Sequence, residues 1–154
     1  MKEVIIISPH CDDECIGAYK FLKEATIIIY DAIASIERRN EALTLKSKMS
    51  NIKAQLFQNT IPSSFLNKEN MLLFPCIEEV HPLHRKWSYM GEQLSRNGLN
   101  IIFYTINMNV PYIREVEDIK GKEDLLNSIY PSQSDMWKYE KKYVIWEGFC
   151  KWIF

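Results

Sequence analysis

The chain has 154 residues, of which 47% are hydrophobic and 25% are charged, and this composition is typical of one globular domain rather than of a disordered segment. Nineteen basic and twenty acidic residues leave a net charge of −1, so bulk charge gives no reason to expect nucleic acid as a partner. The longest apolar runs are too short to cross a bilayer and no signal-peptide pattern opens the chain, so we expect a cytoplasmic protein with a single domain over residues 1–154.

Strands and helices alternate along the predicted fold. Five short apolar runs predict strands, over residues 3–8, 25–31, 52–58, 70–76 and 99–107. Five further stretches predict helices, over residues 13–24, 36–50, 83–97, about 121–129 and from about 134 to the end. Such an alternation predicts a mostly parallel sheet with helices on both faces. With right-handed crossovers, this is a Rossmann-like, doubly wound α/β fold with about five strands.

Polar residues follow three of the predicted strands. Residues 9–14, Pro-His-Cys-Asp-Asp-Glu, come after the first strand, and Tyr30 and Asp31 end the second. His81 and His84 come shortly after the fourth. In sheets of this type, ligands bind beyond the carboxyl ends of the strands. All three histidines of the chain are therefore expected at one edge of the sheet, in two motifs.

These histidines and carboxylates suit a catalytic zinc site. Pro82 fits the first position of a helix, so we expect His81 at its cap and His84 in its first turn, with both rings on the same side. Two imidazoles and one carboxylate make a three-ligand site with a position open for water. Asp12 and Asp13 on a tight turn point in different directions, so one can bind the metal while the other acts as general base. A second histidine outside the metal sphere can stabilise an oxyanion, and such a site hydrolyses amides or esters.

Simpler interpretations of the same residues are open. Three acids at the start of a helix complement the helix dipole without any metal. Two histidines three residues apart are common on helix surfaces. Cys11 and Cys15 are expected to be small buried thiols of a reducing compartment, although a thiol this close to a metal can also bind it. The joint placement of both motifs at one sheet edge favours the metal site.

The two motifs resemble those of a known family. Residues 9–14, with Gly17 three residues later, resemble the Pro-His-Pro-Asp-Asp-Glu signature of the LmbE-like, or PIG-L, zinc N-deacetylases. His-Pro-Leu-His at residues 81–84 resembles the His-Pro-x-His of that family. Two weaker matches follow in the same order, at Arg38 with Glu41 and at Ser132 with Gln133. Members of the family remove an N-acetyl group from a glucosamine unit carried by inositol, malate or another aglycone.

The resemblance implies a role for each residue of the two motifs. His10, Asp13 and His84 would bind one zinc ion per chain, with Fe²⁺ as the alternative metal in cells. Asp12 would be the general base. His81 would be a protonated donor to the oxyanion, so that activity falls as the pH rises past its pKa. The implied function is the zinc-dependent removal of an N-acetyl group from an N-acetylglucosamine-like substrate by metal-activated water.

The chain departs from the family pattern in ways that bear on the substrate. Cys11 replaces the usual proline, Leu83 stands where an acid is common, and few residues lie between the third and fourth predicted strands, where sugar-recognition loops are expected. We therefore expect an open site that suits a bulky or polymeric carrier, or one that borrows walls from another subunit. Arg38 and Asp31 are the expected substrate contacts. Two other functions fit: zinc-dependent hydrolysis of another amide or ester, for example on a modified nucleoside, and metal binding without turnover.

The C-terminal stretch from residue 136 is rich in aromatic residues. Its simplest interpretation is a core helix, because one set of side chains roughly follows helical spacing: Trp137, Val144, Ile145, Phe149 and Trp152. Tyr139, Tyr143 and Trp146 lie partly off that face. They predict a contact within a homo-oligomer or with a membrane surface.

Overall fold

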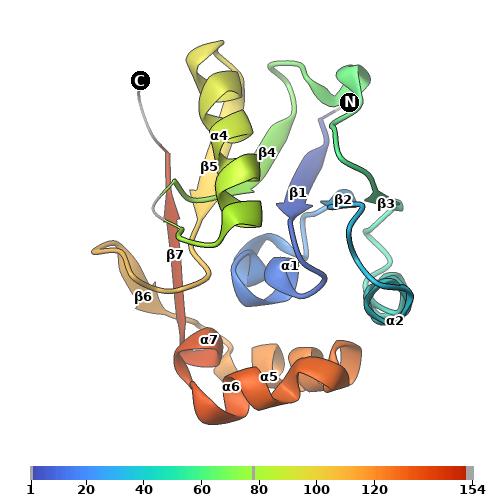
Figure 1. Cartoon of the computed structure of the whole chain (residues 1–154), viewed down its shortest axis with the longest axis vertical. Coiled ribbons are helices and arrows are strands. Elements are labelled where there is room, and N and C mark those ends of the chain that lie inside the picture. The colour runs from blue at the N-terminus through green and yellow to red at the C-terminus, as the bar shows by residue number, and fades with distance from the viewer. Residues whose placement is uncertain (1, 78, 152–154) are drawn as a thin grey trace.

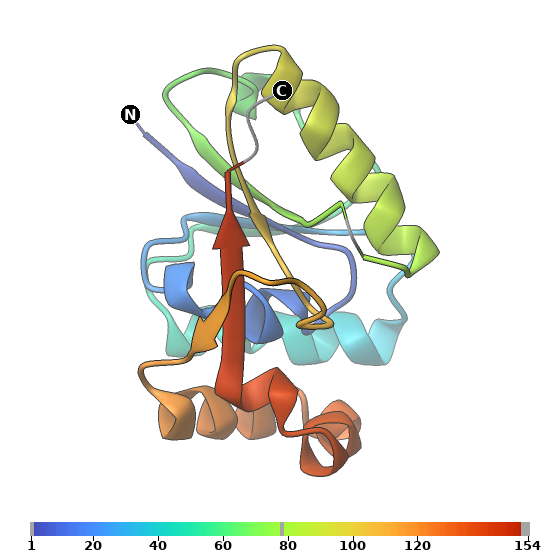
Figure 2. The ribbon, with the colours of Figure 1, turned by 90° about the vertical axis from the view of Figure 1, so that its left-hand side faces the viewer.

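The computed structural model describes residues 2–77 and 79–151, and these form an α/β fold built on one seven-stranded sheet (Figures 1 and 2). The strands lie in the order β3-β2-β1-β4-β5-β7-β6. Their bounds are β1 Val4–Ser8, β2 Ile27–Tyr30, β3 Ala54–Phe57, β4 Met71–Pro75, β5 Asn100–Tyr104, β6 Ile113–Glu115 and β7 Trp146–Cys150. The predicted Rossmann-like α/β class is confirmed, but the sheet has seven strands rather than about five.

The five predicted strands form the parallel part of the sheet. β1 lies between β2 and β4, with Ile6 opposite Ile28 on one side and opposite Leu73 on the other. These strands are rich in branched aliphatic residues that are buried on both faces, as parallel strands covered by helices require. From β1 the chain moves outward through β2 to β3, and it then crosses back to β4 on the other side of β1 and moves outward to β5 in the opposite direction. This reversal is the topological switch point at which α/β proteins bind ligands.

Helices cover both faces of the sheet. α4 (Pro82–Arg96) covers one face and buries Trp87 in a cluster with Ile5 and Phe74. The other face carries α1 (Asp13–Ile16), α2 (Ile36–Leu43) and α3 (Leu45–Lys48), and α5 (Ile119–Ile129) packs against α1 on the side away from the sheet (Figure 1). Figure 2 shows α4 on its own side of the sheet. None of the helices within residues 2–77 and 79–151 is long and apolar enough to cross a bilayer.

Two of the predicted helices are interrupted. The helix predicted over residues 13–24 ends after one turn as α1, and a 3₁₀ turn follows at Tyr19–Phe21. Gly17 lies so close to the ring of Tyr104 that a Cβ atom at this position would come within 2.4 Å of it. The chain bends away at this close approach, so the helix stops there. The helix predicted over residues 36–50 is present as α2 and α3, which meet at Thr44.

The long helix predicted from residue 134 to the end is wrong. Its first part forms two short helices, α6 (Ser134–Tyr139) and α7 (Lys142–Ile145), and β7 follows directly. β7 pairs antiparallel with β5 and with β6, a three-residue strand that the sequence pattern does not predict. The edge of β5 offers unpaired backbone hydrogen-bonding groups, and β7 satisfies them. Residues 146–150 therefore form a strand, although the spacing of their aromatic residues fits a helix.

The aromatic residues of this C-terminal segment are divided between core and surface. Trp137 and Val144 are buried, as predicted, and Phe149 is half-buried. Tyr139 is 85% exposed and Trp146 is 36% exposed, so the oligomer or surface contact expected there stays a prediction. The predicted core residue Trp152 lies outside the described residues.

Lys122 on α5 is a buried cation. Its side chain is fully buried, and the bond that its Nζ donates to the carbonyl oxygen of Trp146 is long, at 3.4 Å. Burial lowers the pKa of Lys122 to about 8, although the nearby Glu147 carboxylate acts in the opposite direction. The folded chain therefore holds this proton more weakly than the unfolded chain, in which the pKa is near 10.5.

This titration predicts how stability changes with pH. Below pH 8 the buried charge costs stability, and the cost falls as the pH rises from about 8 to about 10.5. We expect Lys122→Met to stabilise the fold by about 2 kcal/mol at pH 7 and by much less at pH 10, in urea unfolding of both proteins. Lys122→Arg keeps the charge and should not stabilise. A Lys122→Met protein that is no more stable than the parent at pH 7 would contradict this account.

Candidate metal centre

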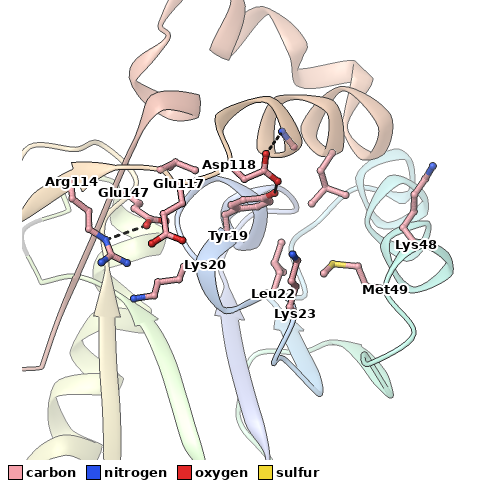
Figure 3. Close-up of a pocket in the computed structure, with 13 residues that line it drawn as sticks. Tyr19, Lys20, Leu22, Lys23, Lys48, Met49, Arg114, Glu117, Asp118 and Glu147 are labelled. Atoms are coloured by element: carbon pink, nitrogen blue, oxygen red, sulfur yellow. Dashed lines mark hydrogen bonds and ion pairs between the residues drawn. The ribbon is translucent and has the colours of Figure 1, made fainter.

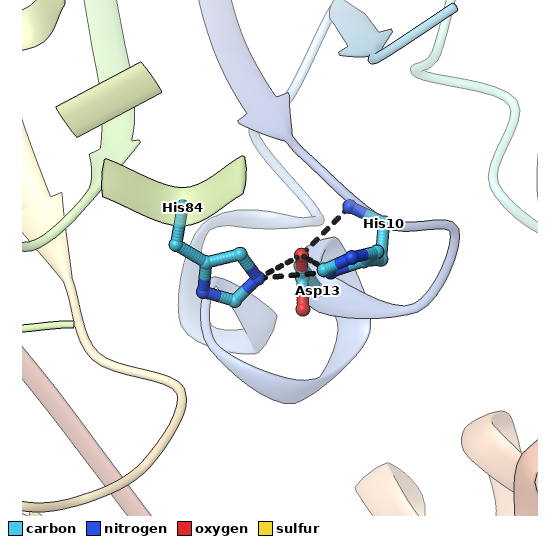
Figure 4. Close-up of side chains that lie close together, drawn as sticks. All are labelled: His10, Asp13 and His84. Carbon is cyan, nitrogen blue, oxygen red and sulfur yellow. Dashed lines mark hydrogen bonds and ion pairs between the residues drawn. The ribbon is translucent and has the colours of Figure 1, made fainter. Parts of the chain in front are cut away.

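The carboxyl ends of β1 and β4 bring the two histidine motifs together (Figure 4). His10 lies in the loop after β1, Asp13 is the first residue of α1, and His84 lies in the first turn of α4. Pro82 is the first residue of α4 and His81 caps this helix, as the sequence predicts. In Figure 4 the side chains of His10, Asp13 and His84 point toward one another. Together they form a possible metal-binding triad.

The spacing of the three ligand atoms matches a tetrahedral metal site. His84 Nε2 lies 2.9 Å from Asp13 Oδ2 and 3.0 Å from His10 Nδ1. The third edge, from His10 Nδ1 to Asp13 Oδ2, is 3.3 Å. Four-coordinate zinc with bonds of about 2.0–2.1 Å keeps its ligand atoms about 3.3 Å apart. An ion of this size therefore fits among the three atoms after shifts of a few tenths of an ångström.

Asp13 and His84 stabilise each other's charged forms. Burial opposes the charge on Asp13, but the adjacent His84 and hydrogen bonds from both histidines lower the pKa of Asp13 well below its usual value. Burial likewise disfavours the charged form of His84, yet the Asp13 carboxylate raises the pKa of His84 above its usual value. A metal needs the neutral imidazole, so metal binding must displace the proton that this pair holds.

Glu79 lies behind His84 and is placed to orient its ring. His84 Nδ1 is buried without a hydrogen-bond partner, and Glu79 Oε2 lies 4.0 Å from it. Glu79 is itself buried and accepts hydrogen bonds from the hydroxyl of Thr105 and from the backbone of Ile106 and Asn107. A carboxylate in this position fixes the ring of a metal-binding histidine and makes it more basic. The only signal for Glu79 in the sequence is its position two residues before His81.

Glu79→Gln tests this support. Gln has nearly the same shape and can still accept hydrogen bonds from the backbone, but it carries no charge. We expect zinc affinity to fall about 10–100-fold, as it does for other groups that support a metal ligand. Competition with a chelator measures this. Glu92→Gln, near the other end of α4 where Glu92 pairs with Arg96, is the matched control and should bind as the parent does. Unchanged affinity in Glu79→Gln would show that Glu79 serves the fold alone.

Asp12 lies beside the triad and is held by Arg38. Arg38 Nη2 lies 3.0 Å from Asp12 Oδ2, and the same group donates to the carbonyl oxygen of Cys11. Burial, and then the neighbouring Asp13 carboxylate, raise the pKa of Asp12 well above its usual value, while Arg38 partly offsets this. Asp12 is therefore a carboxylate of raised basicity next to the triad, and a general base needs this property.

His81 is exposed at the mouth of the site. Its ring lies edge-on to that of His10, with the ring centroids 4.6 Å apart. The backbone N–H of Leu83 donates to His81 Nδ1 over 3.1 Å, so the proton of the neutral ring lies on Nε2. Burial, and then His10 and His84, lower the pKa of His81 below its usual value. The structure thus favours a neutral donor at His81 over the protonated one expected from the sequence.

The triad opens into a pocket of about 290 Å³. Part of its wall comes from the C-terminal segment, where Gln133, Met136 and Tyr143 line it opposite Ile106. The sequence analysis names Gln133 only in a weak family match and Tyr143 only as partly off the core face of a predicted helix, and it predicts no pocket contact for any of the three. The volume lies just below the range of about 300–1,000 Å³ that is typical for drug-sized ligands, so the pocket suits one small group such as a single sugar ring.

The structure separates the two predicted substrate contacts. Arg38 lines the pocket. Asp31 does not line it and is buried, with its Oδ2 accepting from Trp87 Nε1 at 2.8 Å and pairing with Lys86 Nζ at 3.0 Å. Asp31 therefore anchors α4 to the end of β2, and its predicted contact with substrate is replaced by this structural role.

The remaining polar residues of the first motif serve the core. Cys11 and Cys15 are buried free thiols. Burial raises the pKa of Cys11 to about 12 and that of Cys15 well above its usual value, so both are protonated thiols near neutral pH. Neither belongs to the triad. Glu14 accepts hydrogen bonds from Ser8 and Tyr30, and thereby ties α1 to the two strands before and after it.

A solved structure shares the fold of this chain, but the comparisons do not show its family. No family model matches the chain. The chain is similar to the leucine–tRNA ligase of Dichelobacter nodosus (strain VCS1703A), with 27% identity over 108 residues that cover 64% of this chain and only 12% of the ligase. It is also similar to the crystal structure of the conserved protein TT1542 from Thermus thermophilus, with a TM-score of 0.61 and 15% identity over 99% of this chain and 95% of that one. At this identity, the second likeness concerns the fold alone.

Proposed function

We propose that the chain is a zinc-dependent amide hydrolase, a short member of the LmbE-like N-deacetylases that removes an acetyl group from an N-acetylglucosamine-like unit. One observation carries the proposal: a single pocket combines the triad with Asp12 and His81. Structural zinc sites are closed by four protein ligands and need no base beside them. Three ligands with a base and a donor nearby are instead typical of hydrolysis.

The chain's own residues supply most of the proposed chemistry. A divalent ion held by His10, Asp13 and His84 would lower the pKa of water and polarise the substrate carbonyl. Asp12 accepts a proton from the attacking water, because burial raises its pKa well above the usual value and it lies in the same pocket. His81 donates from Nε2 to the carbonyl oxygen as negative charge develops there. Asp12 can then return the proton to the leaving amine.

The shape of the site supports a sugar that carries a further group. The pocket of about 290 Å³ has room for one acetylated sugar ring, with the apolar side chains of Met136 and Ile106 against it and Arg38 as a donor. A second hollow of about 200 Å³ adjoins it, because both are lined by His10 and Arg38. Ile33 lines this second hollow and is 75% exposed. The carrier of the sugar would lie there.

Acetate release tests the proposal. The zinc-loaded protein is incubated with N-acetylglucosamine derivatives that differ in their carrier, and with acylated nucleosides and simple esters. We expect acetate and a free amine from at least one amino-sugar derivative, and none from the same reaction after chelation. Turnover of only the nucleosides or esters would replace the N-deacetylase with the broader hydrolase. No turnover by protein that holds one zinc per chain would leave a metal-binding module.

A further inference from the structure

A second and larger cavity lies beyond the end of α1 (Figure 3). Its volume is about 540 Å³, and it shares no lining residue with the pocket of the metal centre. Its walls come from the 3₁₀ turn at Tyr19–Phe21, the end of α3, and the segment that runs from β6 into α5. The volume is within the range of about 300–1,000 Å³ that small organic ligands occupy.

The interior of this cavity is largely apolar. Its apolar lining residues are Tyr19, Leu22, Met49, Val116 and Leu125. Figure 3 draws Leu22 and Met49 among the side chains that line the cavity. Apolar side chains around a concave volume of this size gain free energy when an apolar ligand replaces water.

Cationic side chains without carboxylate partners surround the opening. Lys20, Lys23 and Lys48 line the cavity and are exposed. Within the described part of the chain, the lysines that form ion pairs are others: Lys53, Lys86, Lys120 and Lys142. The three cavity lysines are therefore available to an anionic ligand.

Two of the three carboxylates of the lining are already engaged. Glu147 Oε1 lies 3.2 Å from Arg114 Nε. Its other oxygen has no hydrogen bond, but the buried ammonium of Lys122 lies close enough for the two charges to interact. Asp118 caps α5 by accepting from the backbone of Gly121 at 3.0 Å, and it also accepts from the hydroxyl of Tyr19 at 3.4 Å. The partners of Asp118 are neutral, so it keeps its charge, and the two carboxylates of Glu117 and Asp118 stand against three lysines. The charge left at the opening is therefore positive.

We propose that this cavity is a second ligand site, which binds an amphipathic organic anion. The apolar body packs against Tyr19, Leu22 and Met49, and the anionic head is held by the lysines at the opening. The site is separate from the metal centre, so this binding does not depend on the proposed hydrolysis.

A pair of dyes tests the proposal on the zinc-loaded protein. 8-Anilinonaphthalene-1-sulfonate carries an apolar body and one anionic head, and N-phenyl-1-naphthylamine is the same body without the sulfonate. We expect saturable binding of the anionic dye. The double change Lys23→Gln with Lys48→Gln should weaken this binding about 5–10-fold, because two partly exposed charge contacts are lost. Binding of the neutral dye should not change. Lys120→Gln with Lys138→Gln changes two lysines that do not line the cavity and is the matched control.

The methyl resonance of Met49 locates the dye independently of fluorescence. Titration with the anionic dye should shift the resonance of Met49. The resonance of Met136, which lies in the pocket of the metal centre, should not change. Displacement of the dye by octanoate or by phenyl phosphate supports the site and identifies the head group it prefers. Three results would overturn the proposal. The Met136 resonance shifts and that of Met49 does not, the lysine variant loses affinity for both dyes equally, or neither competitor displaces the anionic dye.

Discussion

His10→Ala and His84→Ala will each bind zinc more than about 100-fold more weakly than the parent protein, because a change outside the ligand shell already costs about 10–100-fold. Each substitution removes one corner of a triangle of ligand atoms whose edges measure 2.9, 3.0 and 3.3 Å. Two protein ligands are too few to hold zinc against a chelator. Elemental analysis after dialysis and competition with a chelator measure the loss.

His81→Ala is the matched control for this result. Its ring lies 4.6 Å from that of His10, yet its Nδ1 accepts from the backbone of Leu83, and it is not one of the triad. It should therefore keep one zinc per chain. Zinc should also raise the melting temperature of the parent and of His81→Ala but not that of His84→Ala, since a ligand stabilises the state that binds it. Full zinc occupancy in both ligand variants would place the metal elsewhere.

The parallel half of the sheet could be predicted because its signal is local. β1 and β4 are short, mostly apolar runs that end before the histidine motifs. A buried parallel strand is apolar on both faces, so a run of consecutive apolar residues identifies it without knowledge of its neighbours. The position of His10 and His84 at one edge follows from the parallel direction of the strands alone.

The antiparallel part could not be predicted in the same way. β6 has three residues, and what makes it a strand is its pairing with β7, in which Arg114 lies opposite Glu147, 33 residues further along the chain. In β7, Gly148 packs against Thr105 and Ile113, with a Cβ position only 3.0 Å from the former. Such contacts join distant parts of the chain and produce no periodic pattern in the sequence. A helical spacing of aromatic residues was the stronger local signal, and it was misleading.

Within the site, the sequence identified the groups of the two motifs but not their surroundings. Asp31 was misassigned because it follows a strand end, where ligands bind, but the indole of Trp87 holds it in the interior. Glu79 and Met136 were missed because their roles depend on where distant loops return. The two weaker motifs do meet in space, since the backbone of Ser132 donates to Glu41 at 3.0 Å. Motifs thus locate chemistry, and tertiary contacts decide which of their residues face the substrate.

Asp12→Asn will keep its zinc and lose about 10²–10⁴-fold in turnover of an acetylated amino sugar, which is the usual contribution of a general base. Asn has nearly the same shape, and its Oδ1 can still accept from Arg38 Nη2, which lies 3.0 Å from the carboxylate in the parent. What it lacks is the negative charge and, with it, the ability to accept a proton. Measuring kcat and bound zinc on the same sample separates this loss from a loss of metal.

Asp13→Asn and Arg38→Gln sharpen the test of the base. Asp13→Asn makes the same change one residue along but weakens a ligand, so it should lose zinc first and regain activity as zinc is added. Arg38 holds the pKa of Asp12 down against burial, so Arg38→Gln should raise that pKa. Because a base works only when it is deprotonated, the acidic limb of kcat/KM should move to higher pH in Arg38→Gln and disappear in Asp12→Asn. An Asp12→Asn protein with nearly the parent rate would place the base elsewhere.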